Sequence, residues 1–385
     1  MLHRRVLRYG CFCLVICLLL GNNFTLDSVA KAVVATVSVP GISAQSAILI
    51  EAESGEVVYE KNALVRLPMA STTKIMTAII AIENTDPAMM VEISPLAVGV
   101  EGSSIYLYKG ERLSMENLLY ALLLESANDA AAAIAIAVAG SIEAFADLMN
   151  QKAAELRLTD THFTNPHGLD DEEHYTTASD LAKIAAYCMR NDLFRTIVAT
   201  QRMTIPLNDT EGVRLLLNHN RLLRSYEGTI GLKTGYTKRS GRCLVSAAER
   251  DGVTLIAVTL NAPDDWDDHR QMFDYGFDKY ESLFLQSAGS YSLTIPVVSG
   301  TRSSVTVINE KEVHVILPKQ HGEITCSCEV PRWTAGGIIQ GEALGRLVWH
   351  CDGKIIATEP LIAQESIPLV KPKLSLWERI LALFS

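Results

Sequence analysis

Runs rich in β-forming residues near both ends of the first 285 residues enclose a long stretch with the pattern of helices. The expected strands are 47–50, 57–59, 230–234, 243–247 and 253–260. Gly55 and Gly252 lie in the turns of two expected hairpins, because glycine adopts the backbone angles of tight turns without strain. Strands from both ends with helices between them predict one antiparallel sheet covered by helices, which is an α+β fold.

The helices expected between these strands are strongly apolar. The first begins near Ser71, contains Ile75, Met76 and Ile79, and ends before Pro87. The others are expected at about 115–124, at 129–139, after Gly140 and at 266–280. A helix that is apolar around most of its circumference belongs inside a core, so we expect the first helix to be buried on all sides.

The chain of 385 residues is longer than a single core normally supports, so we expect more than one domain. Beyond about residue 287, short alternating runs predict a small all-β domain, a spacer or docking module without a cluster of His, Asp and Glu suited to chemistry. We expect a signal peptide at 1–32, a catalytic domain at 33–285, the β-rich domain at 286–370 and a tail at 371–385.

The start of the chain has the composition of a secretory signal peptide. Arg4, Arg5 and Arg8 precede an apolar run at 11–20, and cleavage is expected after Ala32. An uncleaved membrane anchor is the alternative, although a spanning helix needs about 20 apolar residues. In both cases we expect the body of the protein to be exported.

The tail combines charged residues with a group of large apolar ones. The apolar members are Leu376, Trp377, Ile380, Leu381, Leu383 and Phe384. This pattern predicts a short amphipathic helix on the outer face of the cytoplasmic membrane, with an ordinary docked terminal helix as the alternative.

Charge and cysteine content exclude several classes of partner. The formal net charge is −10, and removing the leader, which carries a net charge of +3, leaves −13. Nucleic-acid phosphates favour clustered Lys and Arg, so we expect no nucleic acid as a partner. Outside the leader lie Cys188, Cys243, Cys326, Cys328 and Cys351. We expect buried free thiols with at most one disulfide among the last three, and no metal or cofactor.

Ser71 and Lys74 are three residues apart at the start of a helix, hence on one face and within mutual reach. A serine hydroxyl becomes nucleophilic when a neighbouring base takes its proton, and lysine can be that base if burial or another cation lowers its pKa. Alone this pattern has little weight, since Ser-x-x-Lys occurs by chance in many exposed helices.

Two further elements strengthen the hypothesis. Ser126 and Asn128 lie in a turn between helices, and Lys233-Thr234-Gly235 ends a β-rich run. We expect Gly235 to leave room for a substrate that pairs with the strand backbone, and Lys233 to bind a carboxylate and lower the pKa of the helix lysine. A helix cap at Ser126 and a solvated Lys233 are the ordinary alternatives, but they do not explain why the elements occur together.

The three elements are Ser71-x-x-Lys74, Ser126-x-Asn128 and Lys233-Thr234-Gly235. Together they resemble the signature of penicillin-binding proteins and serine β-lactamases. The stretches 70–78, 126–130, 165–169 and 231–237 are similar to the low-molecular-mass D-alanyl-D-alanine carboxypeptidases. The resemblance implies a β-lactamase/D,D-peptidase-like fold, peptidoglycan stem peptides ending in D-Ala-D-Ala as substrates, and β-lactam antibiotics as inhibitors.

The resemblance assigns roles to the first two motifs by matching position. Ser71 would be the acylated nucleophile, and Lys74 the base that activates it. Ser126 would relay the proton to the leaving D-alanine, while Asn128 would hold the substrate amide or orient Lys74.

The third motif would bind the substrate. Lys233 and Thr234 would hold the terminal carboxylate, and Gly235 and Tyr236 would lie along the bound peptide. The backbone N–H groups of Ser71 and Tyr236 would form the oxyanion hole.

Histidines and arginines near the motifs leave two questions open. Relatives often carry an arginine shortly before the third motif as an extra carboxylate ligand, but here His219 occupies that position, with Arg221 and Arg224 nearby. His167 and His174 suggest a serine–histidine enzyme, yet no Gly-x-Ser-x-Gly elbow surrounds a serine. We expect His167 to be structural.

The favoured hypothesis is therefore an exported serine D,D-carboxypeptidase. A β-lactamase or D,D-endopeptidase and a catalytically silent cell-wall binding protein are the alternatives. No clear glutamate loop of the class A β-lactamase kind lies between Asn128 and Lys233.

Overall fold

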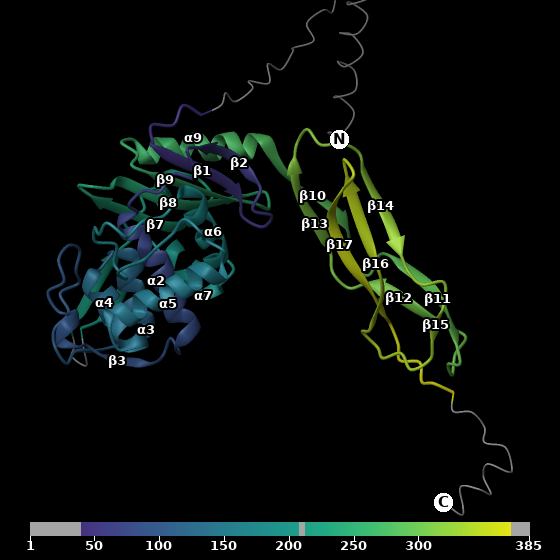
Figure 1. Cartoon of the computed structure of the whole chain (residues 1–385). Coiled ribbons are helices and arrows are strands. Elements are labelled where there is room, and N and C mark those ends of the chain that lie inside the picture. The colour runs from purple at the N-terminus through teal and green to yellow at the C-terminus, as the bar shows by residue number, and fades with distance from the viewer. Residues whose placement is uncertain (1–39, 208–211, 371–385) are drawn as a thin grey trace, which may run out of the picture. The chain divides into compact units, whose positions relative to one another are not determined.

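The structure is a computed structural model that describes residues 40–207 and 212–370 (Figure 1). The signal peptide expected at 1–32 and the tail expected at 371–385 lie outside the described residues. Within the described ranges, no single helix is long and apolar enough to cross a membrane, although Asn128–Ala139 and Ile142–Glu155 pass that test together as a pair bent by 82°.

Five antiparallel strands form the central sheet, in the order β2-β1-β9-β8-β7. They are β1 (Ser46–Glu51), β2 (Val57–Lys61), β7 (Thr229–Thr237), β8 (Gly241–Arg250) and β9 (Val253–Leu260). β1 pairs with β9, with Ile48 opposite Val258. The predicted sheet from both ends of the domain is confirmed, but β7 is longer than expected, so Lys233-Thr234-Gly235 lies inside the strand and not at its end.

Helices cover both faces of this sheet (Figure 1). They are α2 (Lys74–Asn84), α3 (Met115–Leu124), α4 (Asn128–Ala139), α5 (Ile142–Glu155), α6 (Ala178–Cys188), α7 (Asp192–Ala199), α8 (Leu222–Ser225) and α9 (Asp265–Lys279). Side chains alternate along β1, so that Ile48 and Ile50 belong to the core shared with α2 to α7, whereas Ala47 and Leu49 pack in the core that includes Phe273 of α9.

α2 lies at the centre of the helical layer and contacts α3, α4, α5, α6 and α7. Residues 74–81 of this helix are all buried, as predicted, whereas its last residues, 82–84, are half-buried or exposed. The helix starts directly after a 3-10 turn, η1 (Ala70–Thr73), which contains Ser71. The serine of the first motif therefore lies on a turn that leads directly into the buried helix.

Smaller elements border the helical layer. They are η2 (Pro95–Ala97), the hairpin of β3 (Met90–Glu92) with β4 (Arg112–Ser114), and the hairpin of β5 (Arg202–Pro206) with β6 (Val213–Leu217). Side-chain caps fix several helix starts: the hydroxyl of Ser114 accepts from the N–H of Asn117 at the start of α3, and Ser141 caps α5 in the same way.

Between α9 and residue 370, where the described residues end, the named elements are all strands. β10 (Tyr280–Gln286) pairs with β13 (Val313–Pro318). The other sheet has the order β14 (Ile324–Glu329), β16 (Ala343–Cys351), β17 (Lys354–Ala363), β12 (Ser304–Asn309), β11 (Ser292–Val298) and β15 (Thr334–Ala335). Buried Val305, Val307, Leu347 and Leu361 belong to its core. The predicted all-β character of this part of the chain is confirmed.

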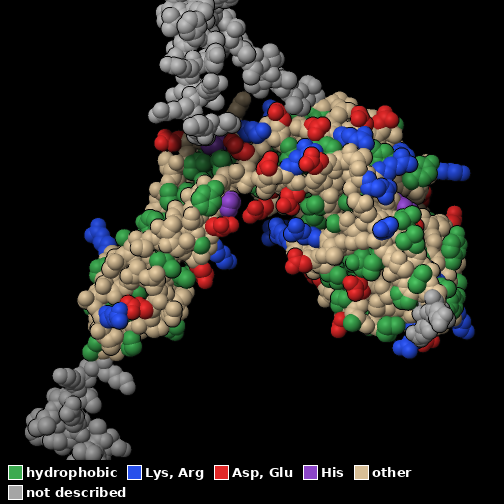
Figure 2. All heavy atoms as spheres, turned by 180° about the vertical axis from the view of Figure 1, so that it is seen from behind, with side chains coloured by type: hydrophobic (Ala, Val, Ile, Leu, Met, Phe, Trp, Pro, Cys, Tyr) green, Lys and Arg blue, Asp and Glu red, His purple; other side chains and the backbone are tan. Residues whose placement is uncertain are grey.

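The five cysteines of the described residues are all unpaired. Cys188, Cys243 and Cys351 are buried, as expected of structural thiols. Cys326 and Cys328 are exposed, and for these two the expectation of burial is wrong, because they lie on β14, the edge strand of its sheet. On the face seen in Figure 2, acidic and basic side chains lie intermixed over the surface.

Candidate active site

Ser71 and Lys74 meet as the sequence predicts. Nζ of Lys74 lies 2.9 Å from Oγ of Ser71. The lysine is fully buried, whereas Ser71 is only partly buried and lines a cavity. The hydroxyl is thus open to a substrate from one side and in contact with an amine from the other.

Two further acceptors hold the amine of Lys74. Nζ lies 2.6 Å from Oδ1 of Asn128 and 2.6 Å from the carbonyl oxygen of His167. A neutral amine has two N–H bonds and one lone pair. If the two N–H bonds point to Asn128 and His167, the lone pair faces Oγ of Ser71, which is the geometry required of a general base.

The environment of Lys74 favours its neutral form. Burial is the main cause that lowers its pKa well below the ordinary value, and the positive charge of Lys233 lowers it further. The carboxylate of Asp129 opposes the shift to a smaller extent. Burial and a neighbouring cation are the two causes that the sequence led us to expect.

A tightly fixed loop presents the carbonyl of His167. Oδ1 of Asn165 accepts from the N–H of Gly168 at 2.7 Å, and the hydroxyl of Thr77 donates to the carbonyl of Pro166 at 2.6 Å. Gly168 has φ +85°, and a Cβ atom there would collide with the carbonyl of Ala70 at 1.9 Å. The glycine is therefore needed to pack this loop against the turn of the nucleophile.

The ring of His167 is desolvated in this arrangement. Burial, and then the nearby Lys74, lower its pKa to about 3, so the imidazole is neutral at ordinary pH. His167 was expected to be structural, and its backbone carbonyl contacts the amine of Lys74. Sequence reasoning missed this contact, because a backbone acceptor leaves no residue-type signal.

The second motif closes the site from the end of α3. Ser126 lies between α3 and α4 with φ +60°, is 5% exposed, and lines the same cavity as Ser71. Asn128 is the first residue of α4, and its Nδ2 donates to the carbonyl of Glu101. The amide of Asn128 thus orients Lys74 through its Oδ1, while its Nδ2 is held by the backbone of Glu101.

The third motif lies on β7 beside the nucleophile. Lys233 is 1% exposed, its Nζ lies 2.9 Å from the carbonyl of Thr234, and burial lowers its pKa to about 7, against the opposing influence of Glu125. A Cβ atom on Gly235 would lie 3.0 Å from the backbone nitrogen of Ser71. The glycine thus makes room for the turn of the nucleophile, a role that we did not predict.

The cavity at these motifs has a volume of about 340 Å³. Its lining residues are Ser71, Ser103, Ser126, His219, Arg221, Thr234, Gly235, Tyr236, Arg242, Asp265 and Trp266. Lys74, Asn128 and Lys233 are not among them, because these three side chains are buried behind the residues that line the cavity. The structure therefore brings all three motifs together at one opening.

The residues before the third motif are only partly where we expected them. His219 and Arg221 line the cavity, but Arg224 does not. Nε2 of His219 lies 3.3 Å from the carboxylate of Glu125, and burial followed by the charge of Lys233 lowers the pKa of His219. His219 therefore does not supply a permanent positive charge as an arginine would.

Ser103, Arg242, Asp265 and Trp266 line the cavity without having been predicted. Arg242 contacts the carboxylate of Asp265 at 2.9 Å. The hairpin register places Arg242 opposite Tyr236, so that the pairing of β7 with β8 was the signal that could have identified it. The other three come from loops or a helix start that carries no motif.

Sequence comparison gives matches over most of the chain. Residues 33–264 match the D-alanyl-D-alanine carboxypeptidase family, and residues 280–369 match the C-terminal domain of penicillin-binding protein 5. The D-alanyl-D-alanine carboxypeptidase DacF of Bacillus subtilis is 32% identical, over 84% of this chain and 86% of the relative. DacC of Escherichia coli is 30% identical, over 86% of each chain.

Solved structures agree with the sequence matches. Penicillin-binding protein 5 from Haemophilus influenzae superposes with a TM-score of 0.67 at 27% identity, over 86% of this chain and 99% of that chain. PBP3 from Streptococcus pneumoniae shares the fold, with a TM-score of 0.73 at 24% identity, over 85% and 99% of the two chains. The chain therefore belongs to the family of serine-type D-alanyl-D-alanine carboxypeptidases, the low-molecular-mass penicillin-binding proteins.

Proposed function

We propose that this protein is an exported, penicillin-sensitive D,D-carboxypeptidase that removes the terminal D-alanine from peptidoglycan stem peptides through an acyl-enzyme on Ser71. The observation that carries the proposal is the environment of the Lys74 amine, which is buried and has its pKa lowered. Its Nζ contacts Asn128 and His167, and its third contact is Oγ of Ser71. A buried amine of this kind can remove the serine proton.

In the proposed acylation step, Oγ of Ser71 attacks the carbonyl carbon of the penultimate D-alanine while its proton passes to Nζ of Lys74. The oxyanion accepts hydrogen bonds from the backbone N–H groups of Ser71 and Tyr236. The close approach of Gly235 to the nitrogen of Ser71 supports this pairing of strand and turn. The C–N bond to the terminal D-alanine then breaks as Ser126 relays the proton from Nζ of Lys74 to the leaving nitrogen, and water later hydrolyses the ester.

Substrate binding falls to β7 in this proposal. Lys233 and Thr234 hold the terminal carboxylate of the peptide, and Gly235 and Tyr236 lie along its backbone. The buried position of Lys233 next to the cavity supports this role, because an ammonium group shielded from water attracts a carboxylate strongly.

Incubation with a fluorescent penicillin and with a D-Ala-D-Ala peptide tests the proposed function. We expect a long-lived covalent adduct with the penicillin and release of free D-alanine from the peptide. Rapid turnover of the penicillin would indicate a β-lactamase, and cleavage of cross-linked peptides alone would indicate an endopeptidase. Penicillin binding without any hydrolysis would favour a cell-wall binding protein.

The pH dependence of substrate binding follows from Lys233, whose pKa is about 7 in the empty site. A bound carboxylate favours the ammonium form and raises this pKa, so binding takes up a proton above about pH 7. We expect KM for the peptide to rise with pH above that value and to be nearly constant below it. Steady-state kinetics across the neutral and alkaline range measures this.

Lys233→Arg is the matched control, because its guanidinium stays charged at these pH values. The KM of this variant should not follow the alkaline rise seen with the native lysine. A KM that is independent of pH in the native protein would show that Lys233 does not bind the carboxylate.

The tail at 371–385 lies outside the described residues and stays a proposed membrane anchor. Each apolar CH₂ group that it buries at the bilayer would contribute about 0.8 kcal/mol. We expect deletion from Leu374 onward to release the enzyme from membranes while its rate on a soluble peptide is unchanged. Sedimentation with membranes measures this, and a truncated protein that still pellets would exclude the tail as the anchor.

A further inference from the structure

A loop between η2 and β4, at residues 101–107, borders the proposed catalytic residues. Nδ2 of Asn128 donates to the carbonyl of Glu101, and the backbone N–H of Asn128 donates to the carbonyl of Ser103 at 2.7 Å. Between them, Gly102 has φ +97°, and a Cβ atom there would lie 2.7 Å from Nδ2 of Asn128. Because the same asparagine orients the lysine base, the position of this loop and that of the base are linked.

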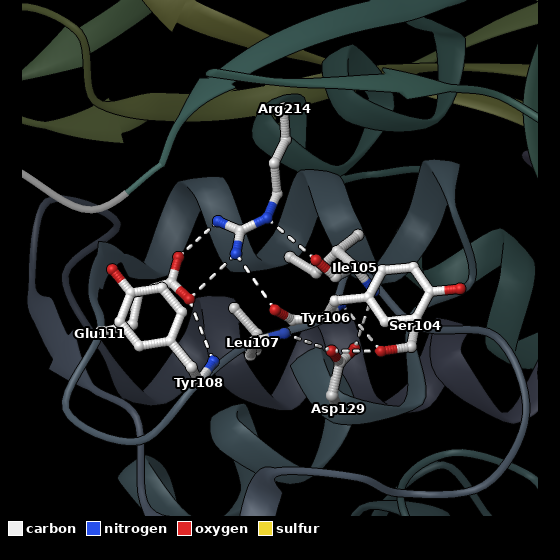
Figure 3. A network of polar contacts seen from close by, with 8 residues as sticks. All are labelled: Ser104, Ile105, Tyr106, Leu107, Tyr108, Glu111, Asp129 and Arg214. Atoms are coloured by element: carbon white, nitrogen blue, oxygen red, sulfur yellow. Dashed lines mark hydrogen bonds and ion pairs between the residues drawn. The ribbon is translucent and has the colours of Figure 1, made fainter. Parts of the chain in front are cut away.

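Asp129 holds the 101–107 loop from the side of α4. Its carboxylate, 1% exposed, accepts from the hydroxyl of Ser104 at 2.6 Å and from the backbone N–H groups of Leu107 at 2.9 Å and Ile105 at 3.3 Å (Figure 3). These charge-assisted hydrogen bonds from three donors fix the conformation of the loop and its position against α4.

Arg214 of β6 holds the same loop from the other side (Figure 3). Its Nε donates to the carbonyl of Ile105 at 2.9 Å, and Nη2 donates to that of Tyr106 at 3.4 Å. The guanidinium also forms a two-pronged ion pair with Glu111, in which Nη2 lies 3.0 Å from Oε2. The side chains are 12% and 0% exposed, so solvent screens this pair little.

Glu111 is anchored directly after the loop as well, since its Oε2 accepts from the N–H of Tyr108 at 3.2 Å. Arg214 therefore joins two separate parts of the chain by at least three bonds, although more than 100 residues separate it from the loop. The planar guanidinium with its five donors contacts both carbonyls and the carboxylate at once.

We propose that Arg214 is a positioning residue for acylation, which acts by fixing the 101–107 loop against Asn128 and so keeps Lys74 dry and oriented toward Ser71. This inference rests on the proposed function of Ser71 and Lys74. Arg214 does not line the cavity and touches no reacting atom.

The inference has a consequence for pH dependence, because burial is the largest cause of the low pKa of Lys74. A loosened loop would admit water, and the pKa of Lys74 would rise. The charged or titratable groups that face Lys74 are Lys233, which lowers its pKa, Asp129, which raises it, and the neutral rings of His167 and His174. A substitution at Arg214 replaces none of these side chains.

The test compares wild type with the double variant Arg214→Met with Glu111→Gln, which removes the ion pair without leaving a buried charge unpaired. The second-order rate of acylation by a fluorescent penicillin is measured as a function of pH. We expect a rate about 10- to 100-fold lower at neutral pH, because small displacements of reacting groups cost this much. We also expect the acid limb, which is the fall of the rate at low pH as Lys74 becomes protonated, to move to higher pH. Alkaline pH should then restore part of the rate.

The matched control is Arg195→Met with Glu249→Gln, which removes an exposed ion pair on α7 and β8. It should acylate as fast as wild type, with the same acid limb. If the double variant at Arg214 does not fold, as thermal unfolding would show, Arg214→Lys replaces it. That variant keeps a charge for Glu111 but loses the forked donors, and it should show a smaller shift in the same direction.

Each outcome separates this inference from the proposed function. Wild type that is not acylated would overturn the function itself. Acylated wild type together with an unshifted acid limb in the Arg214 variant would overturn the positioning role, whether its rate is unchanged or uniformly reduced. A shift of equal size in the control would also overturn it.

Discussion

Ser71→Ala is expected to abolish covalent labelling by penicillin and to lower D-alanine release by at least about 10³-fold, because the substitution removes the oxygen that the proposed mechanism acylates. Ser71 is the serine of the described residues whose Oγ lies 2.9 Å from the amine of Lys74. Removing one partly exposed hydroxyl leaves the packing of α2 intact. Gel fluorescence and an assay for free D-alanine measure the two effects.

Ser179→Ala is a suitable control, since Ser179 lies on α6 and does not line the cavity. It should label and hydrolyse like wild type. Both variants should unfold at a temperature close to that of wild type. Persistent labelling of Ser71→Ala would place the nucleophile at another residue, with Ser126 as the first candidate.

Lys74→Arg is expected to be nearly inactive, whereas Lys233→Arg should retain measurable acylation. Guanidinium does not give up its proton in proteins, so arginine cannot serve as the base at position 74. At position 233 the proposed role needs a positive charge, which arginine supplies, and the loss should fall mainly on substrate affinity. Second-order acylation rates and KM values for the two variants measure this difference.

The two variants serve as controls for each other, because both place a larger, charged side chain in a buried position next to the same cavity. A general effect of size would slow both to the same degree. If Lys74→Arg acylates as fast as Lys233→Arg, Lys74 is not the base, and the proton leaves Ser71 by another route.

Much of the architecture was predictable from local patterns. The spacing of apolar residues in α2 and the hairpin turns near Gly55 and Gly252 are signals that act within a few residues, and the structure confirms them. The assignment of Ser71 and Lys74 to one face also needed only the geometry of a helix start. The meeting of the three motifs at one cavity followed from the resemblance, because spacing along the chain does not give distances between separate elements.

The missed features depend on contacts over long separations in sequence. The carbonyl of His167 contacts Lys74 across 93 residues, and Arg214 contacts the carbonyl of Ile105 across 109. Backbone acceptors are the same in every residue, so that no motif marks them. Gly235 lines the cavity, and its missing Cβ also lets the backbone of Ser71 approach, a second contact that the sequence did not reveal.

The central claim is tested most directly by mass spectrometry of the enzyme after rapid mixing with a D-Ala-D-Ala peptide and acid quenching. The account predicts an ester of the shortened peptide on the fragment that contains Ser71, with one free D-alanine released for each acyl group formed. An adduct on any other residue, or release of D-alanine without an adduct under conditions that trap the penicillin ester, would contradict it.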